Sequence, residues 1–232
     1  MSTKKFLDLD GLSRVWSKVT GKFALKSLYD DTGINVGRKA NTTNGTYSTA
    51  EGRYTTASGS YSHSEGSYTT ASGNYSHSEG SYTNATGTYS HAEGYQAIAS
   101  GSSSHAEGSN TVASANYTHA EGNYTLANGN CAHAEGGNNS AVSIKVTGNA
   151  DATTYTVADT TNVKAGNYLR VGSVVSKVTS VVANTSITVT PTLSSTALTN
   201  ATAYVMLSVA SGAASHSEGN KTLSSESKIG RA

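Results

Sequence analysis

The sequence predicts an all-β protein, a parallel β-roll of 14-residue coils with a short helix before it and a small antiparallel β domain inserted into it. Three observations lead to this fold class. Six of the seven histidines recur every 14 residues, each followed two residues later by a glutamate. Glycines recur every seven residues from Gly45 to Gly136, with one interruption at Ala115. Only 35% of the 232 residues are hydrophobic, so the repeats can form a core only by stacking on one another.

Composition and charge narrow the class of protein. Residues 41–141 contain Arg53 against seven glutamates, whereas residues 1–40 contain eight Lys or Arg and four Asp or Glu. An acidic roll argues against nucleic acid as a partner, since binding to phosphates needs a basic stripe. The first ten residues carry charges instead of an apolar run, so we expect no signal peptide and no membrane insertion. The single cysteine, Cys131, excludes an intrachain disulfide and a cysteine-based metal site.

Residues 1–42 are expected to form an N-terminal anchor that contains a helix within residues 1–30. The apolar residues have the three- and four-residue spacing of an amphipathic helix and are Leu9, Leu12, Val15, Trp16 and Val19. This face packs on the same chain, or it anchors the chain to other molecules; the sequence leaves both readings open.

Residues 43–141 are expected to form the roll. A strand alternates its two faces, so His63 and Glu65 share one side while Ser64 points to the other. Small residues at the Ser64 position recur every seven residues, nearly all of them Ala, and predict a flattened roll with two closely spaced strands per coil. The recurrent glycines are expected at turns that need a positive φ or a close approach of two backbones.

The 14-residue repeat of His and Glu, called the comb below, stops after residue 141 and resumes at His216 and Glu218. Removing 69 residues would place His216 14 residues after His133, so the roll is expected to resume in phase. Residues 142–209 are therefore predicted to be an inserted domain, and residues 210–232 the resumed coil and C-terminal end. Alternating apolar and polar residues at 155–157, 168–171, 186–189 and 203–207 predict antiparallel strands in a small barrel or sandwich.

The repeats resemble a known family. The half-repeats Tyr-Ser-His-Ser-Glu-Gly at 61–66 and Tyr-Thr-Thr-Ala-Ser-Gly at 68–73 resemble the YadA-type heads of trimeric autotransporter adhesins, over residues 43–141 and 211–226. The resemblance implies a left-handed roll and a homotrimer. The Ser-His-Ala/Ser-Glu-Gly version is more similar to repeats in tail-fibre, tailspike and head-fibre proteins of bacteriophages. Residues 6–12 and 16–19 are similar to the virion-attachment ends of such proteins.

The histidines and glutamates form a repeat ladder with the members His63, Glu65, His77, Glu79, His91, Glu93, His105, Glu107, His119, Glu121, His133, Glu135, His216 and Glu218. Imidazole and carboxylate suit metal binding and acid–base catalysis, but a catalytic site needs one constellation and this pair recurs seven times. We therefore predict no catalytic residue, no cofactor and no metal ligand, with an ion on a three-fold axis left open. The ladder is expected to hydrogen-bond between coils or chains, with charged imidazoles whose pKa is raised.

Tyrosines recur near the predicted turns, where they cap the edges of the roll or form a ladder for glycans. The inserted domain adds three tyrosines that are candidates for glycan contact, Tyr155, Tyr168 and Tyr204.

Together these features predict a non-enzymatic virion fibre or spike, a homotrimer anchored through residues 1–30 to a capsid or tail, which adheres to the host surface and its glycans. Two alternatives are a bacterial autotransporter-type adhesin and a tailspike polysaccharide hydrolase. The hydrolase would need clustered, unrepeated carboxylates, for which the insertion offers Asp151 and Asp159. The last coil ends at Ala232, so we expect either a capping protein or cleavage of a longer precursor.

Overall fold

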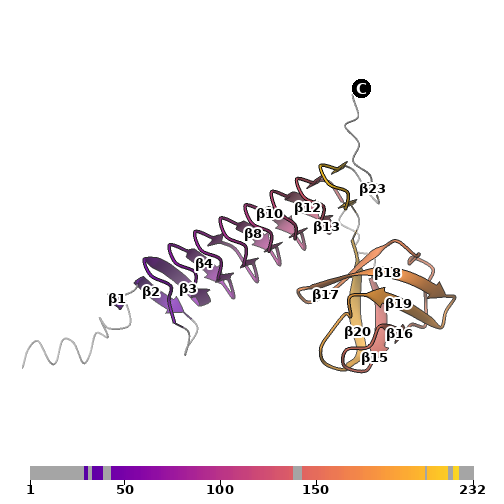
Figure 1. Cartoon of the computed structure of the whole chain (residues 1–232). Coiled ribbons are helices and arrows are strands. Elements are labelled where there is room, and N and C mark those ends of the chain that lie inside the picture. Colours follow the sequence, from indigo (N-terminus) through magenta and orange to yellow (C-terminus); the bar gives the residue numbers. More distant parts are fainter. Residues whose placement is uncertain are drawn as a thin grey trace, which may run out of the picture.

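The fold combines a parallel β-solenoid with a closed antiparallel barrel (Figure 1). A computed structural model describes residues 29–30, 33–38, 43–137, 143–206, 208–218 and 222–224. These residues contain strands and no helix, and thus no helix that could cross a membrane. The helix expected within residues 1–30, with Leu9, Leu12, Val15, Trp16 and Val19, lies outside the described residues.

The solenoid runs through two sheets, and most of its coils add one short strand to each. Its strands are β1 (Tyr29–Asp30), β2 (Gly33–Arg38), β3 (Ser48–Ala57), β4 (His63–Ser67), β5 (Thr70–Ala71), β6 (His77–Ser78), β7 (Asn84–Ala85), β8 (His91–Tyr95), β9 (Ile98–Ala99), β10 (His105–Ser109), β11 (Val112–Ala113), β12 (His119–Asn123), β13 (Thr125–Ala127), β14 (His133–Ala134), β21 (Ser208–Ala210), β22 (His216–Ser217) and β23 (Thr222–Ser224). From β3 onward each strand pairs in parallel with its own copy in the next coil, so His105 lies beside His119 and Val112 beside Leu126. The predicted parallel roll is confirmed.

The roll begins earlier than its period suggests. Strand β2 lies within the segment expected to be the anchor, yet it pairs in parallel with β3, where Gly33 faces Ser48 and Arg38 faces Thr55. The residue offset between partners is 15 at the first pair and 17 at the second, because the register shifts between them. This departure from 14 removes the periodic signal that marks the other coils.

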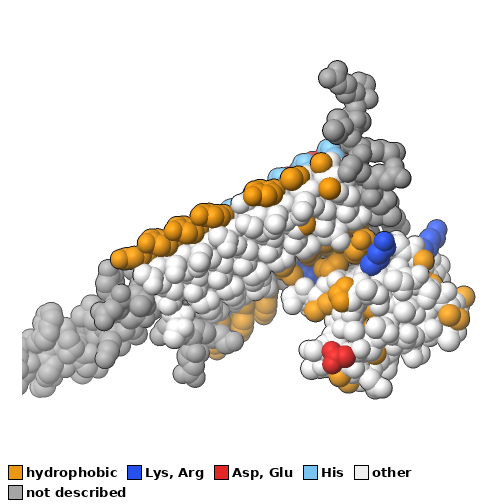
Figure 2. Space-filling model, viewed as in Figure 1, with side chains coloured by type: hydrophobic (Ala, Val, Ile, Leu, Met, Phe, Trp, Pro, Cys, Tyr) orange, Lys and Arg blue, Asp and Glu red, His pale blue; other side chains and the backbone are white. Residues whose placement is uncertain are grey.

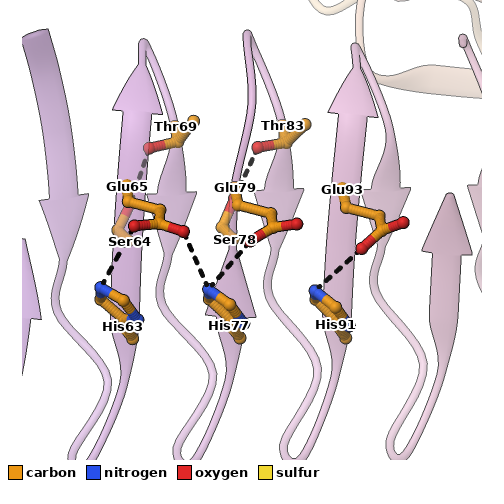
Figure 3. Close-up of polar contacts among 10 residues, drawn as sticks. All are labelled: His63, Ser64, Glu65, Thr69, His77, Ser78, Glu79, Thr83, His91 and Glu93. Atoms are coloured by element: carbon orange, nitrogen blue, oxygen red, sulfur yellow. Dashed lines mark hydrogen bonds and ion pairs between the residues drawn. The ribbon is translucent and has the colours of Figure 1, made fainter. Parts of the chain in front are cut away.

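The interior of the roll is made of small side chains. Ala57, Ala71 and Ala85 are fully buried, as the row of small residues predicts. A second buried row, which the prediction missed, includes Thr69 and Thr83, which face Ser64 and Ser78 of the other sheet. Where both partners carry hydroxyls they hydrogen-bond, as Ser64 Oγ does with Thr69 Oγ1 at 2.8 Å (Figure 3). Some of the hydroxyl groups in the interior are thus hydrogen-bonded to one another.

Both rows of glycines approach the next coil closely, and one of the rows also has a positive φ. Gly66 has a φ of +105°, a backbone conformation that side chains rarely adopt, and an added Cβ there would lie 2.1 Å from the carbonyl oxygen of Gly80. An added Cβ at Gly73 would lie 2.0 Å from the carbonyl oxygen of Gly87. Close stacking of the coils therefore requires glycine in both rows, and the positive φ is a further requirement in the row of Gly66.

The solenoid resumes in phase after the insertion. Strand β21 pairs in parallel with β13, with Ala210 beside Ala127, and His216 lies beside His133. This is the register obtained by removing 69 residues from the sequence. The resumed roll begins at Ser208, two residues before the expected boundary.

The inserted domain is a closed barrel. Its strands, in barrel order, are β15 (Ser143–Gly148), β16 (Thr154–Thr156), β19 (Ser186–Thr190), β18 (Val174–Val182), β17 (Tyr168–Val171) and β20 (Leu198–Val205). Its core consists of large apolar residues, among them Leu169, Ile187 and Val189, which are completely buried. Of the two predicted architectures, barrel and sandwich, the structure has the barrel.

Candidate functional site

The repeat ladder lies on one face of the roll with every imidazole stacked on the next (Figure 3). Ring centroids of consecutive histidines from His63 to His216 are 4.7–4.9 Å apart and the planes are nearly parallel. The parallel pairing of neighbouring coils sets this spacing, because strands in a sheet lie about 4.8 Å apart. The stacked arrangement confirms that the comb is a structural repeat.

The imidazoles and carboxylates lie close together without hydrogen bonding. His77 Nε2 is 4.0 Å from Glu65 Oε1 and 3.7 Å from Glu79 Oε2. The Nε2 atoms from His63 to His133 have almost no solvent-accessible surface and no hydrogen-bond partner within the described part of the chain. The expected hydrogen bonds between coils are therefore absent from these atoms.

The expectation of a raised imidazole pKa is wrong for His91. Burial, and then the like charges that His105 and His77 would carry, lower the pKa of His91, although Glu79 acts in the opposite direction. Burial is the larger cause, and stacking adds to it because an imidazolium at position 91 would have one cationic neighbour above and one below at less than 5 Å.

A shallow groove runs beside the ladder. Its volume is about 500 Å³ and its lining consists of Glu93, Glu107, Gly108, Glu121, Gly122, Glu135 and Gly136. Several His–Glu–His groups along this face bring ligand atoms within 4.8 Å of one another, among them His91, Glu93 and His105. The ladder thus contains the donors from which a metal site could be built.

Tyrosines form a second repeated feature at the roll edges. Tyr61, Tyr75 and Tyr89 stack with centroids 4.9–5.0 Å apart. On the other row Tyr68 stacks on Tyr82 at 4.8 Å. These rings are exposed, and Figure 2 shows a row of hydrophobic side chains in orange along one edge of the roll. Each of these tyrosines has a φ near +57°, an unusual conformation for a bulky residue. Cys131 occupies one such slot as a free, exposed thiol.

The barrel packs against the outer surface of the roll's second sheet. Ile98, Val112 and Leu126, one from each of three coils, are buried together with Met206 and Val209, and Tyr168 and Val175 of the barrel pack against them. The apolar row on the roll is therefore part of an interface within the chain.

A cleft of about 410 Å³ lies at this junction. The roll contributes Ile98, Ser100, Val112, Ser114, Leu126 and Asn128, and the barrel contributes Tyr168, Ser173, Val175, Lys177, Thr190 and Pro191. The Lys177 ammonium lies 6.0 Å from the centre of the Tyr168 ring. Apolar surface, hydroxyls, an aromatic ring and a cation are thus combined in a space of ligand size.

Arg170 fixes the barrel to the roll. Its Nη2 donates to the carbonyl of Gln96 at 2.8 Å and its Nε donates to the carbonyl of Gly172 at 2.7 Å, while Nη1 has no partner among the described residues. Burial lowers the pKa of Arg170 to about 10, only partly offset by Tyr124. The buried Arg170 side chain of the barrel, hydrogen-bonded to a carbonyl of the roll, thus fixes the position of the barrel on the roll.

The three barrel tyrosines have different surroundings. Tyr168 lines the cleft, and Tyr204 packs its ring on Tyr124 of the roll at 5.2 Å. Tyr155 is completely buried, and its hydroxyl accepts a hydrogen bond from the Leu193 amide. The prediction that Tyr155 contacts a glycan is therefore wrong, because its large ring completes the barrel core.

Comparison with models of known families, with curated proteins and with solved structures finds no match to this chain.

Proposed function

We propose that the chain is a structural fibre or spike protein of a virus particle. It forms a homotrimer with a left-handed roll, is anchored to the capsid or tail through residues 1–30, and adheres to the host surface. The support comes from the architecture together with the resemblance of the repeats to trimeric adhesin heads and phage fibres.

One observation carries the proposal: the shaft is continuous past the insertion. His133 pairs with His216 as the other consecutive ladder histidines pair with one another, so the ladder passes the splice point unbroken. The barrel meanwhile packs on the side of the shaft through Arg170 and the buried apolar row. A stiff rod with a domain held at its side suits the display of a binding surface.

The cleft is the proposed adhesive contact. A sugar ring has apolar C–H faces that pack on an aromatic ring and hydroxyls that bond to Ser and Asn side chains. Tyr168, Ser114 and Asn128 supply such groups, and Lys177 adds a cation for an acidic group. We therefore take a host-surface glycan as the ligand.

The two alternatives receive less support. A polysaccharide hydrolase needs a carboxyl group whose pKa is raised so that it can act as an acid. The carboxylate of Asp159 instead accepts hydrogen bonds from the side chain and the amide of Thr161, and these lower its pKa. The bacterial adhesin shares the roll and the trimer, and differs in where the protein is mounted.

Removal of the barrel tests the display role. Deleting residues 139–207 takes out 69 residues and leaves Ser208 14 positions after Thr125, its partner in the roll. We expect light scattering of both proteins to give three chains per particle, 3 times 23.7 kDa for the full chain, and a glycan array to bind the full chain alone. Glycan binding that survives the deletion would move the adhesive site to the roll.

Point variants locate the contact. Tyr168→Ala and Lys177→Gln should each weaken glycan binding about tenfold or more, since one lost charged or aromatic contact is worth about 1.4 kcal/mol or more. Lys145→Gln is the matched control because Lys145 is an exposed barrel lysine outside the cleft. A loss of equal size in Lys145→Gln and Lys177→Gln would indicate a general charge effect instead of a contact in the cleft.

Antibody labelling tests the mounting. Electron micrographs of particles labelled with an antibody against the full chain should show label at the capsid or the tail. Label on bacterial surfaces and on no particle would favour the autotransporter-type adhesin.

A further inference from the structure

We propose that the repeat ladder is a row of binding sites for divalent transition-metal cations, each formed by one imidazole Nε2 and the carboxylates of the two glutamates that flank it along the roll. The proposal concerns the roll of a single chain and does not rest on the proposed function.

The distances fit a bound ion better than they fit hydrogen bonds. His133 Nε2 is 3.4 Å from Glu121 Oε1 and 3.9 Å from Glu135 Oε2. Two ligand atoms on a tetrahedral ion, with bonds of 2.0–2.2 Å, are about 3.4 Å apart. Both Nε2-to-oxygen distances of His133 therefore lie within about 0.5 Å of the spacing of two ligand atoms on one ion. His77, between Glu65 and Glu79, repeats the arrangement with 4.0 and 3.7 Å (Figure 3).

The unsatisfied Nε2 atoms give a second, independent reason. They are shielded from solvent and have no hydrogen-bond partner within the described ranges, a state that costs free energy for a buried polar atom. A proton on Nε2 would still be too far from a carboxylate to make a good hydrogen bond, and a lone pair there would face carboxylate oxygens. A cation between imidazole and carboxylate satisfies both groups.

The charge around the ladder points the same way. Arg53 is the only Lys or Arg between residues 41 and 141, and its guanidinium lies over the rings of Tyr54 and Tyr68, 5.1 and 5.4 Å from their centroids. The glutamates beside the groove therefore repeat from coil to coil without a basic side chain among them. Bound dications would neutralise this row.

The donor set selects the type of ion. Mixed imidazole and carboxylate ligands suit Zn²⁺, Ni²⁺ and Cu²⁺, whereas Mg²⁺ and Ca²⁺ prefer oxygen alone. Stacked imidazoles 4.7–4.9 Å apart are too distant for one ion with bonds near 2.1 Å to reach both, so each ion takes one histidine. Two dications one coil apart repel strongly, so we expect alternate coils to fill first, with about three ions per chain.

Titration of the chelator-stripped full chain with ZnCl₂ at pH 7.5, followed by calorimetry, tests the proposal. We expect about three zinc ions per chain, bound at least about tenfold more tightly than magnesium from MgCl₂. We also expect zinc to raise the melting temperature of the chain, and a chelator to reverse both the binding and this rise. Equal affinity for zinc and magnesium would overturn the proposal, because it would reduce the ladder to an unspecific acidic groove.

His133→Gln should remove about one zinc equivalent, since His133 has carboxylate oxygens on both sides. Tyr75→Phe changes an exposed ring of the roll that belongs to none of the His–Glu groups, so it is the control and should leave the zinc count unchanged. Glu121→Gln keeps every imidazole and should repeat the loss seen for His133→Gln. Equal zinc counts in all three variants and the wild type would contradict the assignment.

Discussion

The roll and the barrel bury their interiors in different ways. The barrel core contains Leu169, Ile187 and Tyr155, each completely buried, so removal of large apolar surfaces from water stabilises it. The roll encloses mainly Ala, Ser and Thr, each of which buries little apolar surface. Its coils are held by parallel backbone hydrogen bonds and by stacking of identical side chains.

This difference explains why one region repeats and the other does not. In the roll each residue contacts its own copy one coil away, such as His91 on His105 and Gly73 on Gly87, so a change at one position must fit above and below. In the barrel each core residue contacts different neighbours, and many combinations of apolar volumes fill the same space. The roll is therefore expected to be intolerant of added volume where the barrel is tolerant.

The largest expected effect comes from adding one methyl group to the roll. Gly73→Ala would place a Cβ 2.0 Å from a backbone oxygen of the next coil, and backbone on both sides cannot yield locally. We expect a loss of about 3 kcal/mol or more in the free energy of unfolding, measured by chemical denaturation. Gly172→Asn in the barrel is the control, since Gly172 has a φ of +58°, which Asn tolerates, and open space around it. The contrast fails if the two variants lose similar stability.

Changes in the hydroxyl pairs inside the roll are expected to alter stability less, with one variant stabilised and the other destabilised. Thr111 Oγ1 is buried and has no hydrogen-bond partner among the residues that the structure describes, because residue 106, at the position of Ser64, is Ala. Ala106→Ser should complete the pair and stabilise the roll by about 1 kcal/mol. Ala92→Ser faces Ala97 and should destabilise the roll by about 1 kcal/mol or more. Thermal melts of the two variants measure the difference, and equal shifts would show that the paired hydroxyls contribute nothing.

The smallest expected effect is on pH dependence. Because the folded pKa of His91 lies below the unfolded value near 6.5, the unfolded chain takes up the proton first. The stability that His91 contributes is therefore complete above the unfolded pKa and declines as the pH falls below it. In a metal-free buffer with chelator, His91→Gln should reduce the loss of melting temperature between pH 7.5 and about pH 5.5. A wild type that becomes more stable on acidification would restore the model of charged pairs.

The roll could be predicted from the amino-acid sequence. The 14-residue comb, the row of small residues and the recurrent glycines follow from the need of each coil to match the next, so they are visible without coordinates. The in-phase return at His216 was readable for the same reason. Strand β2 was not, because its offset from β3 departs from the period.

The distances and contacts between side chains could be found only from the three-dimensional structure. The sequence places His and Glu on one face, but only side-chain packing sets the distances of 3.4–4.0 Å between Nε2 and carboxylate oxygens. Packing also produces the burial that, together with the neighbouring histidines, lowers the pKa of His91. The burial of Tyr155 and the docking of the barrel on Ile98, Val112 and Leu126 likewise depend on contacts between residues distant in sequence. A repeat encodes its contacts locally because every neighbour is a copy, whereas a unique interface forms between surfaces that no period relates.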